Sequence, residues 1–293
     1  MKPAPFEYHA PRTLDEALAL LAQYGSDAKP LAGGQSLIPA MNFRLATPSI
    51  LIDLNRIETL SFVTTRADAL RIGGMTRHRT LERSDAVRQH APLISEAMPF
   101  VAHPAIRTRG TLGGSLAHAD PAAELPAVML ALDATVTLQG ASGSRTVRAT
   151  EFFTGLFSTA IEPGELLAEV EIPAALPRSG HAFQEISRRH GDFALAGAAA
   201  VVAVDENGRC ISARVAVLSV ADRPVLCQHA TGALVGETPT PELIRALAEE
   251  AAVHDIDPPG DIHASSRYRR HLAAVLIRRV LEAAVNSAAG SHA

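Results

Sequence analysis

Two short glycine-rich segments contain the residues of this sequence that are best suited to binding a ligand. Residues 32–37 read Ala-Gly-Gly-Gln-Ser-Leu, and residues 111–115 read Thr-Leu-Gly-Gly-Ser. Paired glycines let backbone N–H groups approach a ligand without obstruction by a Cβ atom, and a serine close to each pair adds a hydroxyl donor. These donors suit a diphosphate. A single Gly-Gly turn is usually structural, but two segments of one pattern favour a dinucleotide held in the crevice between them.

Two carboxylates follow the second glycine segment, at Asp120 and Glu124. They could accept hydrogen bonds from ribitol or ribose hydroxyls. They could equally be the acidic residues that the macrodipole favours at the start of a helix. The residues alone leave both interpretations open.

Other familiar catalytic and metal-binding patterns do not occur near these segments. The sequence between them has no Rossmann fingerprint and no Walker lysine. His118 and Asp120 could ligate a metal ion, but no third ligand accompanies them, so we expect no metal site. No nucleophile–base arrangement lies nearby, and we therefore expect no catalytic side chain in this chain.

The composition excludes several classes of protein. With 293 residues, 47% of them hydrophobic and 20% charged, the chain is long enough for about two globular domains. The net charge of −4 provides no basic field for nucleic acid or an anionic membrane. No apolar run approaches the roughly 20 residues that span a bilayer, and residues 1–7 lack an apolar signal core, so we expect a cytoplasmic protein. Cys210 and Cys227 are too few for an iron–sulfur cluster and are expected to be buried.

The first 57 residues or so are expected to form a small α/β unit. Thr13 and Glu16 form a capping box before a helical pattern that stops at Gly25. Short apolar runs at 29–32 and 50–54 predict two buried strands. The order helix, strand, loop, helix, strand predicts that these strands are parallel.

From about residue 58 the pattern changes to an α+β region with further strands and helices, and Phe152, Phe153 and Phe157 are expected in its core. A linker is expected at 173–180 because of its proline and glycine residues. The expected domains are residues 1–176, with subdomains of about 1–57 and 58–176, then residues 177–286, and a flexible tail at 287–293. The expected later elements are strands at 70–74, 135–138, 166–172, 182–188, 194–204 and 211–218, and helices at 93–98, 125–132, 241–253 and 266–285.

Together, the two glycine segments resemble the two FAD-diphosphate motifs of the molybdenum hydroxylase flavoproteins. The likeness is to the medium subunit of aerobic carbon monoxide dehydrogenase and to the FAD subunits of xanthine dehydrogenase and bacterial N-heterocycle dehydrogenases. It covers essentially the whole chain, including residues 161–167 and 188–194. The resemblance implies an α+β fold: a two-subdomain FAD-binding domain of the vanillyl-alcohol-oxidase (PCMH) type, then a C-terminal domain of antiparallel sheet and helices.

The resemblance also implies a noncovalent FAD site, so no covalent link through His103 is expected. The glycine segments would wrap the diphosphate, and Glu124 would reach the ribitol. Val101 and Leu167 would line the adenine end or the flavin walls, and residues 191–193 would lie near the isoalloxazine. Ser115 and Gln184 depart from residues common in relatives. The implied cofactor-binding residues are Ala32, Gly33, Gly34, Gln35, Ser36, Leu37, Val101, Thr111, Gly113, Gly114, Ser115, Asp120, Glu124, Leu167, Asp192 and Phe193.

The resemblance implies an electron-transfer subunit. It would take electrons from an iron–sulfur small subunit and pass them to an external acceptor. A separate molybdenum-cofactor large subunit would oxidise carbon monoxide or an N-heteroaromatic or aldehyde substrate. Molybdopterin and [2Fe-2S] clusters are expected only in these partners, in a dimer of heterotrimers. The alternatives are a stand-alone FAD-dependent oxidase or reductase and a cofactor-free assembly or scaffold protein of the same fold.

Overall fold

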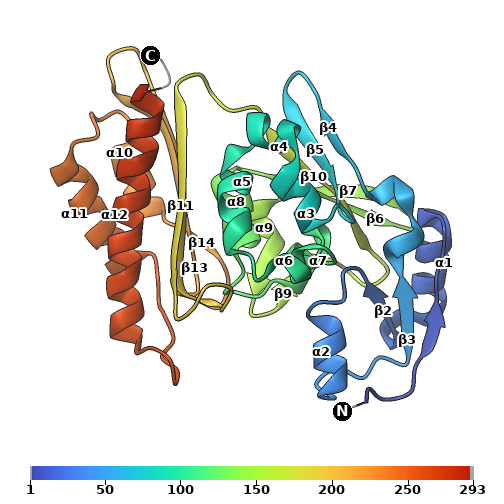
Figure 1. Cartoon of the computed structure of the whole chain (residues 1–293). Coiled ribbons are helices and arrows are strands. Elements are labelled where there is room, and N and C mark those ends of the chain that lie inside the picture. The colour runs from blue at the N-terminus through green and yellow to red at the C-terminus, as the bar shows by residue number, and fades with distance from the viewer. Residues whose placement is uncertain (1, 291–293) are drawn as a thin grey trace.

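Three main β-sheets follow one another across the molecule, and each has its own covering helices (Figure 1). The computed structural model describes residues 2–290. The first sheet has three parallel strands in the order β1 (Glu7–His9), β3 (Ile50–Asp53) and β2 (Ala28–Leu31). The parallel pairing predicted for the two later strands is confirmed, whereas the sequence pattern does not predict β1.

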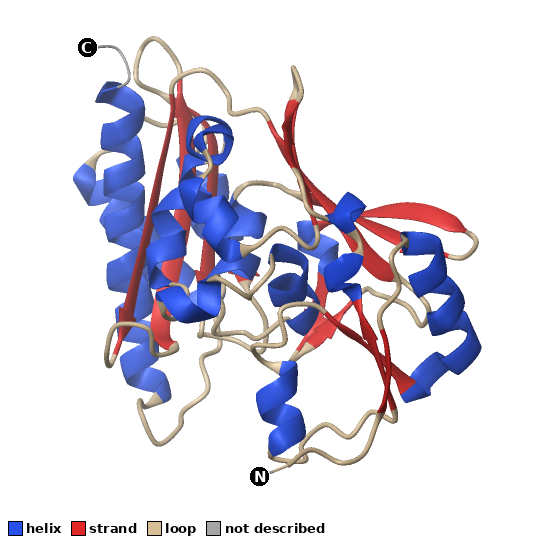
Figure 2. Cartoon of the chain, turned by 45° about the vertical axis from the view of Figure 1, so that its right-hand side comes forward, coloured by secondary structure: helices blue, strands red, loops and turns tan. Residues whose placement is uncertain are grey.

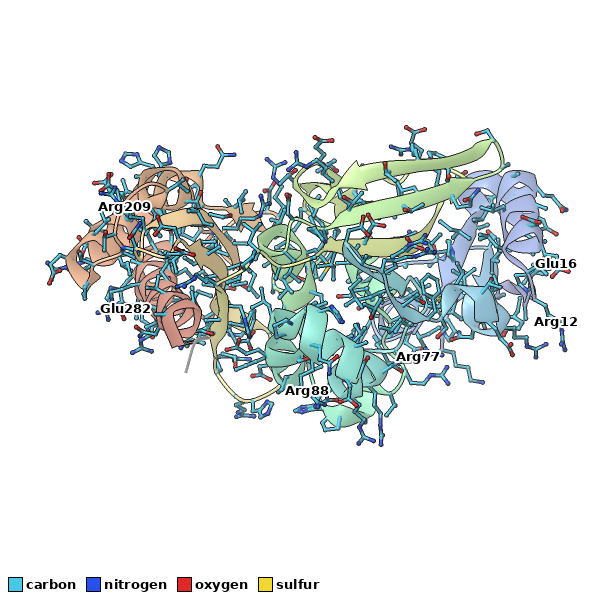
Figure 3. All side chains as sticks on the ribbon, turned by 90° about the horizontal axis from the view of Figure 1, so that it is seen from above. Arg12, Glu16, Arg77, Arg88, Arg209 and Glu282 are labelled. Atoms are coloured by element: carbon cyan, nitrogen blue, oxygen red, sulfur yellow. The ribbon has the colours of Figure 1, made fainter. Side chains whose placement is uncertain are left out.

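Helix α1 (Leu14–Tyr24) covers this sheet and begins where the sequence predicts. The Thr13 hydroxyl accepts a hydrogen bond from the Glu16 N–H at 3.2 Å, and the Glu16 carboxylate accepts one from the Thr13 N–H at 3.3 Å. Figure 3 shows Glu16 with Arg12, whose N–H donates to the same carboxylate. The reciprocal bonds satisfy N–H groups that the first helical turn leaves open.

The second sheet has five antiparallel strands, and short helices and a hairpin lie between these strands along the chain. Its strand order is β4 (Val63–Thr65), β5 (Ala69–Gly73), β10 (Leu166–Pro173), β6 (Thr135–Gly140) and β7 (Gly143–Arg148). The other elements of residues 25–159 are α2 (Leu37–Asn42), α3 (His78–Arg83), α4 (Asp85–His90), α5 (Pro92–Ala97), α6 (Pro104–Arg107), α7 (Leu112–His118), α8 (Glu124–Ala131), α9 (Ala149–Phe152), β8 (Phe153–Gly155), β9 (Ser158–Thr159) and the 3-10 helices η1 (Gly25–Asp27), η2 (Leu54–Arg56), η3 (Glu58–Leu60) and η4 (Met98–Phe100).

The third sheet is antiparallel and lies between two layers of helices (Figures 1 and 2). Every residue of its strand β12 except Val201 is buried, as expected for a strand covered on both faces. The long helix α12 lies on one face, and α5 and α8 lie on the other. Its elements are β11 (Ser179–Ser187), β12 (Ala194–Val204), β13 (Cys210–Leu218), β14 (Val225–Leu226), α10 (Gln228–Leu234), α11 (Pro241–His254) and α12 (Ser266–Gly290).

The flexible tail predicted from residue 287 is wrong for residues 287–290, because α12 continues to Gly290. Ala284 and Ala288 are buried one helical turn apart. A Cβ atom at Gly180 of β11 would overlap the Ala284 carbonyl and the Ala288 N–H, so glycine lets the helix backbone lie directly on the strand. Residues 291–293 of the predicted tail lie outside the described residues. The domain boundary expected at residue 176 falls between β10 and β11 and stays a prediction.

Of the three phenylalanines expected in the core, two are buried and one is not. Phe152 and Phe153 are buried, but Phe157 is 53% exposed at the tip of the β8–β9 hairpin. There its ring lies against His118, with the ring centroids 5.1 Å apart. Cys210 and Cys227 are buried free thiols, which confirms the prediction for them. Across residues 2–290, no helix is long and apolar enough to cross a membrane.

Candidate cofactor-binding site

The two glycine segments, 80 residues apart in sequence, are in direct contact. A Cβ atom at Gly33 would overlap the Arg109 carbonyl oxygen and lie 2.8 Å from the Gly110 Cα. A Cβ atom at Gly114 would lie 3.3 Å from the Ala32 Cβ. Gly33 is therefore required by the neighbouring backbone, and the contact brings both segments to one place.

The first glycine segment connects β2 to α2 and leaves its backbone donors open. Gly34 turns the chain with φ 72°, and the Gln35 side chain donates to the Gly33 carbonyl at 3.0 Å. Between residues 2 and 290, no acceptor is hydrogen-bonded to the N–H groups of residues 33–36. These four N–H groups form the kind of concave donor set that binds an anionic group.

The second glycine segment is helical from Leu112 onward. Thr111 caps α7, and its hydroxyl accepts from the Gly114 N–H at 3.1 Å. The Leu112 N–H donates to the Thr76 carbonyl, and the Gly113 N–H donates to the Gly74 carbonyl at 2.8 Å. Because the N–H groups of residues 112–115 are already bonded, this segment supports the first one and offers a ligand chiefly its side-chain hydroxyls.

A cavity of about 310 Å³ lies beside the first segment. That volume is at the lower end of the range for small-molecule sites and suits one part of a dinucleotide. Asp53 at the end of β3 and Asn55 just after it also line the cavity and were not among the expected site residues, although polar residues at the end of a buried parallel strand are a recognised signal for a ligand site. The cavity is lined by Leu31, Ala32, Gly33, Gly34, Gln35, Ile38, Pro39, Asp53, Asn55 and Arg109.

The buried carboxyl group of Glu124 and the partly buried carboxyl group of Glu185 form a second part of the candidate site. Glu124 is the first residue of α8 and only 8% exposed, and burial raises its pKa to about 7. Burial, with the charge of Glu124 as a smaller cause, raises the pKa of Glu185 to about 8. One oxygen of Glu185 is buried with no hydrogen-bond partner among the described residues. Asp120 instead accepts from the Ala122 N–H at 2.9 Å, in a local turn.

The orientation of β11 explains why Glu185 was missed. Side chains two residues apart on a strand share a face. Phe183 packs in the cluster that contains α5 and α8, whereas Ala182 and Ile186 pack toward α12. Glu185 therefore faces the cluster that contains α5 and α8, and Gln184, the residue noted from the sequence, faces α12.

The remaining residues expected at the site lie on three separate segments. Val101 and Leu167 are buried in the core that the second and third sheets share. Asp192 lies 3.4 Å from Arg188, and Phe193 is 70% exposed, so Phe193 is not part of the core. A Cβ atom at Gly191 would overlap the His103 ring, so this segment packs directly on His103.

The chemistry of the site is that of binding. The described residues contain no group of three or more His, Cys, Asp or Glu side chains that could hold a metal ion. Within residues 2–290, His118 and Asp120 therefore have no third ligand beside them. Open backbone donors, two serine hydroxyls and protonatable carboxyls can hold phosphates and sugar hydroxyls. A diphosphate and a ribitol are groups that these residues can accommodate.

Comparisons with known proteins agree with this chemistry. Residues 4–175 match a family described as the FAD binding domain in molybdopterin dehydrogenase. Residues 181–284 match the CO dehydrogenase flavoprotein C-terminal domain. The expected fold class is thereby confirmed.

Similar proteins cover the chain almost completely. Subunit alpha of the 6-hydroxypseudooxynicotine dehydrogenase complex of Paenarthrobacter nicotinovorans is 45% identical over 98% of this chain and 97% of its own. A chain of carbon monoxide dehydrogenase from Hydrogenophaga pseudoflava superimposes with a TM-score of 0.95 at 39% identity, covering 98% of this chain and 99% of that one. A chain of quinoline 2-oxidoreductase from Pseudomonas putida 86 superimposes with a TM-score of 0.93 at 39% identity, covering 98% of this chain and 99% of that one. The chain therefore belongs to the FAD-binding medium subunits of the molybdenum hydroxylase family.

Proposed function

We propose that the cavity beside residues 32–37 holds the diphosphate of noncovalently bound FAD. The observation that carries this proposal is the set of four open N–H groups at residues 33–36, three of which belong to residues that line a cavity of about 310 Å³, namely Gly33, Gly34 and Gln35. Backbone donors that converge in this way bind phosphate oxygens without a lysine or a metal ion. Thr111 and Ser115 would add hydroxyls from the second segment, where Gly113 and Gly114 let α7 lie close.

The other expected residues would hold the remainder of the cofactor. A protonated Glu124 can donate to a ribitol hydroxyl as well as accept from one, and Asp120 lies just before it. Val101 and Leu167 would form apolar walls. Asp192 and Phe193 would cover the isoalloxazine and limit the access of solvent.

We infer further that the chain is an electron-transfer subunit. When bound, FAD supplies the capacity to accept and release electrons, and the protein supplies its orientation and surroundings. The chain would receive electrons from an iron–sulfur small subunit and deliver them to an external acceptor. A molybdenum-cofactor large subunit would oxidise the substrate, and the whole would assemble as a dimer of heterotrimers.

The names of the relatives support this division of labour. They refer to 6-hydroxypseudooxynicotine, carbon monoxide and quinoline, yet the relatives match this chain over nearly its full length. The same subunit architecture therefore accompanies chemically different substrates. This favours a substrate site outside this chain, for carbon monoxide, an N-heteroaromatic compound or an aldehyde.

We also propose that the complex works in the cytoplasm. The buried, unpaired thiols of Cys210 and Cys227 are compatible with a reducing compartment. Fractionation of the native cells, with antibodies against this chain, tests the proposal, and recovery outside the cytoplasmic fraction would contradict it.

Anaerobic spectroscopy of the native complex tests the proposed function. We expect one FAD per chain, released by acid precipitation, and bleaching of its visible band when the complex meets its substrate. The purified chain with FAD alone should not be reduced by the same substrate. Reduction of the chain alone would favour the stand-alone oxidase or reductase, and absence of flavin from the complex would favour the scaffold protein.

A further inference from the structure

We propose that Arg77, acting through Asn55, positions the first glycine segment for the diphosphate; the inference rests on the FAD site proposed above. The first segment has four open backbone donors, whereas the N–H groups of residues 112–115 are bonded, so the arrangement of the first segment determines how well a diphosphate is held. The segment has little structure of its own beyond the turn at Gly34. Something outside it must therefore hold it in place.

Asn55 holds the start of the segment. Its side-chain N–H₂ donates to the Ala32 carbonyl at 2.9 Å and to the Asp53 carboxylate, and its oxygen accepts from the Arg77 guanidinium at 2.5 Å. A carbonyl can only accept and a guanidinium can only donate, so the orientation of the amide is determined by its partners. The Tyr8 hydroxyl completes the chain of bonds by donating to Asp53 at 2.5 Å.

Arg77 joins this arrangement to the second segment. Its other terminal nitrogen donates to the carbonyl of Arg109, the backbone atom on which Gly33 rests. The planar guanidinium thus spans the contact between the two segments, bonded to a residue on each side of it. Figure 3 shows Arg77 on the ribbon between the N-terminal part and the middle of the chain.

The charge of Arg77 also suits an anion. In the part of the chain that the structure describes, no carboxylate oxygen lies within 4.0 Å of the guanidinium nitrogens of Arg77. Asp53 is connected to Arg77 only through Asn55, by two successive hydrogen bonds. Burial, and then the positive charge of Arg109, lowers the pKa of Arg77, yet a guanidinium remains protonated at neutral pH. Arg77 is therefore a half-buried cation with no carboxylate partner among the described residues, and its positive charge favours an anionic ligand such as a diphosphate.

Binding of ADP, FAD and riboflavin to the full chain tests the inference, because riboflavin lacks the phosphates. We expect Arg77→Met to weaken ADP and FAD binding about tenfold or more and to leave riboflavin binding unchanged. Lysine should not rescue, since one ammonium group cannot reproduce the fork that reaches Asn55 and Arg109. The salt dependence of ADP binding should also decrease in Arg77→Met.

Arg71→Met is the matched control. Arg71 makes two hydrogen bonds of 2.6 Å to Glu169 on the second sheet, so its loss perturbs the fold without touching the glycine segments. Its ADP affinity should remain that of the unchanged chain. If Arg77→Met does not fold, Asn55→Ala gives the same test, because it removes the bond to Ala32 and leaves Arg77 bonded to Arg109.

The outcomes separate the two proposals. If the unchanged chain binds neither ADP nor FAD, the proposed function is wrong and this inference is wrong with it. If the unchanged chain binds ADP and the folded Arg77→Met or Asn55→Ala variant binds it equally well, the positioning role is wrong and the FAD site stands. Equal loss of ADP and riboflavin binding would also overturn it, because that is the result of general destabilisation.

Discussion

At position 33 the backbone of one glycine segment rests on the other, and this contact leaves no room for a side chain. A Cβ atom there would overlap the Arg109 carbonyl. We expect Gly33→Ala to push the segments apart and to weaken FAD binding about tenfold or more, while the chain still folds. Equilibrium dialysis with FAD measures the effect.

Gly232→Ala provides the comparison for this substitution. Gly232 lies in α10, and a Cβ atom there would meet no atom within 4 Å. Its FAD affinity should equal that of the unchanged chain, and its stability should rise slightly because alanine favours a helix. Normal FAD affinity in Gly33→Ala would contradict the importance of the contact.

The buried carboxyl of Glu124 and the partly buried carboxyl of Glu185 should make the stability of the FAD-free chain depend on pH. Burial raises their pKa values to about 7 and about 8, above the value of 4.5 in the unfolded chain. Because the folded chain binds these protons more tightly, the stability they contribute is complete below pH 4.5 and is lost as the pH rises through 7 and 8. We expect Tm to fall on the order of 5 °C between about pH 6 and about pH 9.

Glu185→Gln should reduce this fall in Tm to about half, because a neutral amide no longer titrates. The two groups interact, so the measured steps belong to the pair and not to one residue. Calorimetric scans at a series of pH values give the result. If the Tm of this variant falls with pH as steeply as that of the unchanged chain, Glu185 does not contribute to the pH dependence.

At the scale of single elements, the cap of α7 links local stability to the site. The Thr111 hydroxyl accepts from the Gly114 N–H, so Thr111→Ala should lower the free energy of unfolding by about 1 kcal/mol and weaken FAD binding. Thr240→Ala removes the equivalent cap of α11, where Thr240 accepts from Leu243 at 3.2 Å. It should cost about the same stability with FAD affinity unchanged. If the two variants bound FAD equally well, the cap of α7 would have no role in FAD binding.

The segment that contains Phe193 connects β11 to β12 and packs on His103 through Gly191. Since Phe193 is 70% exposed, Phe193→Ala should change Tm by no more than about 1 °C. With FAD bound, the same variant should shift the visible flavin spectrum and accelerate reoxidation by oxygen. Leu176→Ala, which also removes an exposed apolar side chain, should alter neither property. An unchanged spectrum and reoxidation rate in Phe193→Ala would exclude a cover over the flavin.

At the scale of the whole molecule, Arg214 joins the third sheet to the FAD-binding half. It lies on β13, donates to the Leu130 carbonyl at the end of α8 at 3.0 and 2.8 Å, and lies 3.1 Å from Asp133. Arg214→Met would leave that carbonyl without its partner, and we expect a loss of about 2 kcal/mol in urea unfolding. Arg209→Met, which removes one exposed bond to Gly236, should cost less than about 0.5 kcal/mol. Similar losses for both would contradict the linking role.

The elements that the sequence predicts well are those whose determinants are close together in the chain. The capping box of Thr13 and Glu16 and the stop at Gly25 define α1 without help from the rest of the molecule. The alternation of short apolar runs with a helical pattern was enough to predict the parallel pairing of β2 and β3. The two glycine pairs, each near a serine, were likewise enough to indicate a dinucleotide site and the family.

Other features depend on partners that are distant in sequence, and these only the tertiary structure decided. The second glycine pair is helical, and its donors are already bonded: the Gly113 N–H donates to the distant Gly74 carbonyl and the Gly114 N–H donates to the Thr111 hydroxyl. Glu185, and not Gln184, faces α8 because the register of β11 determines which face each side chain takes. Hydrogen-bond partners and strand register depend on which surfaces pack together, and composition and local pattern do not contain that information. The amino-acid sequence alone therefore determined what kind of ligand the protein could hold, whereas tertiary packing determined which N–H groups remain open to hold it.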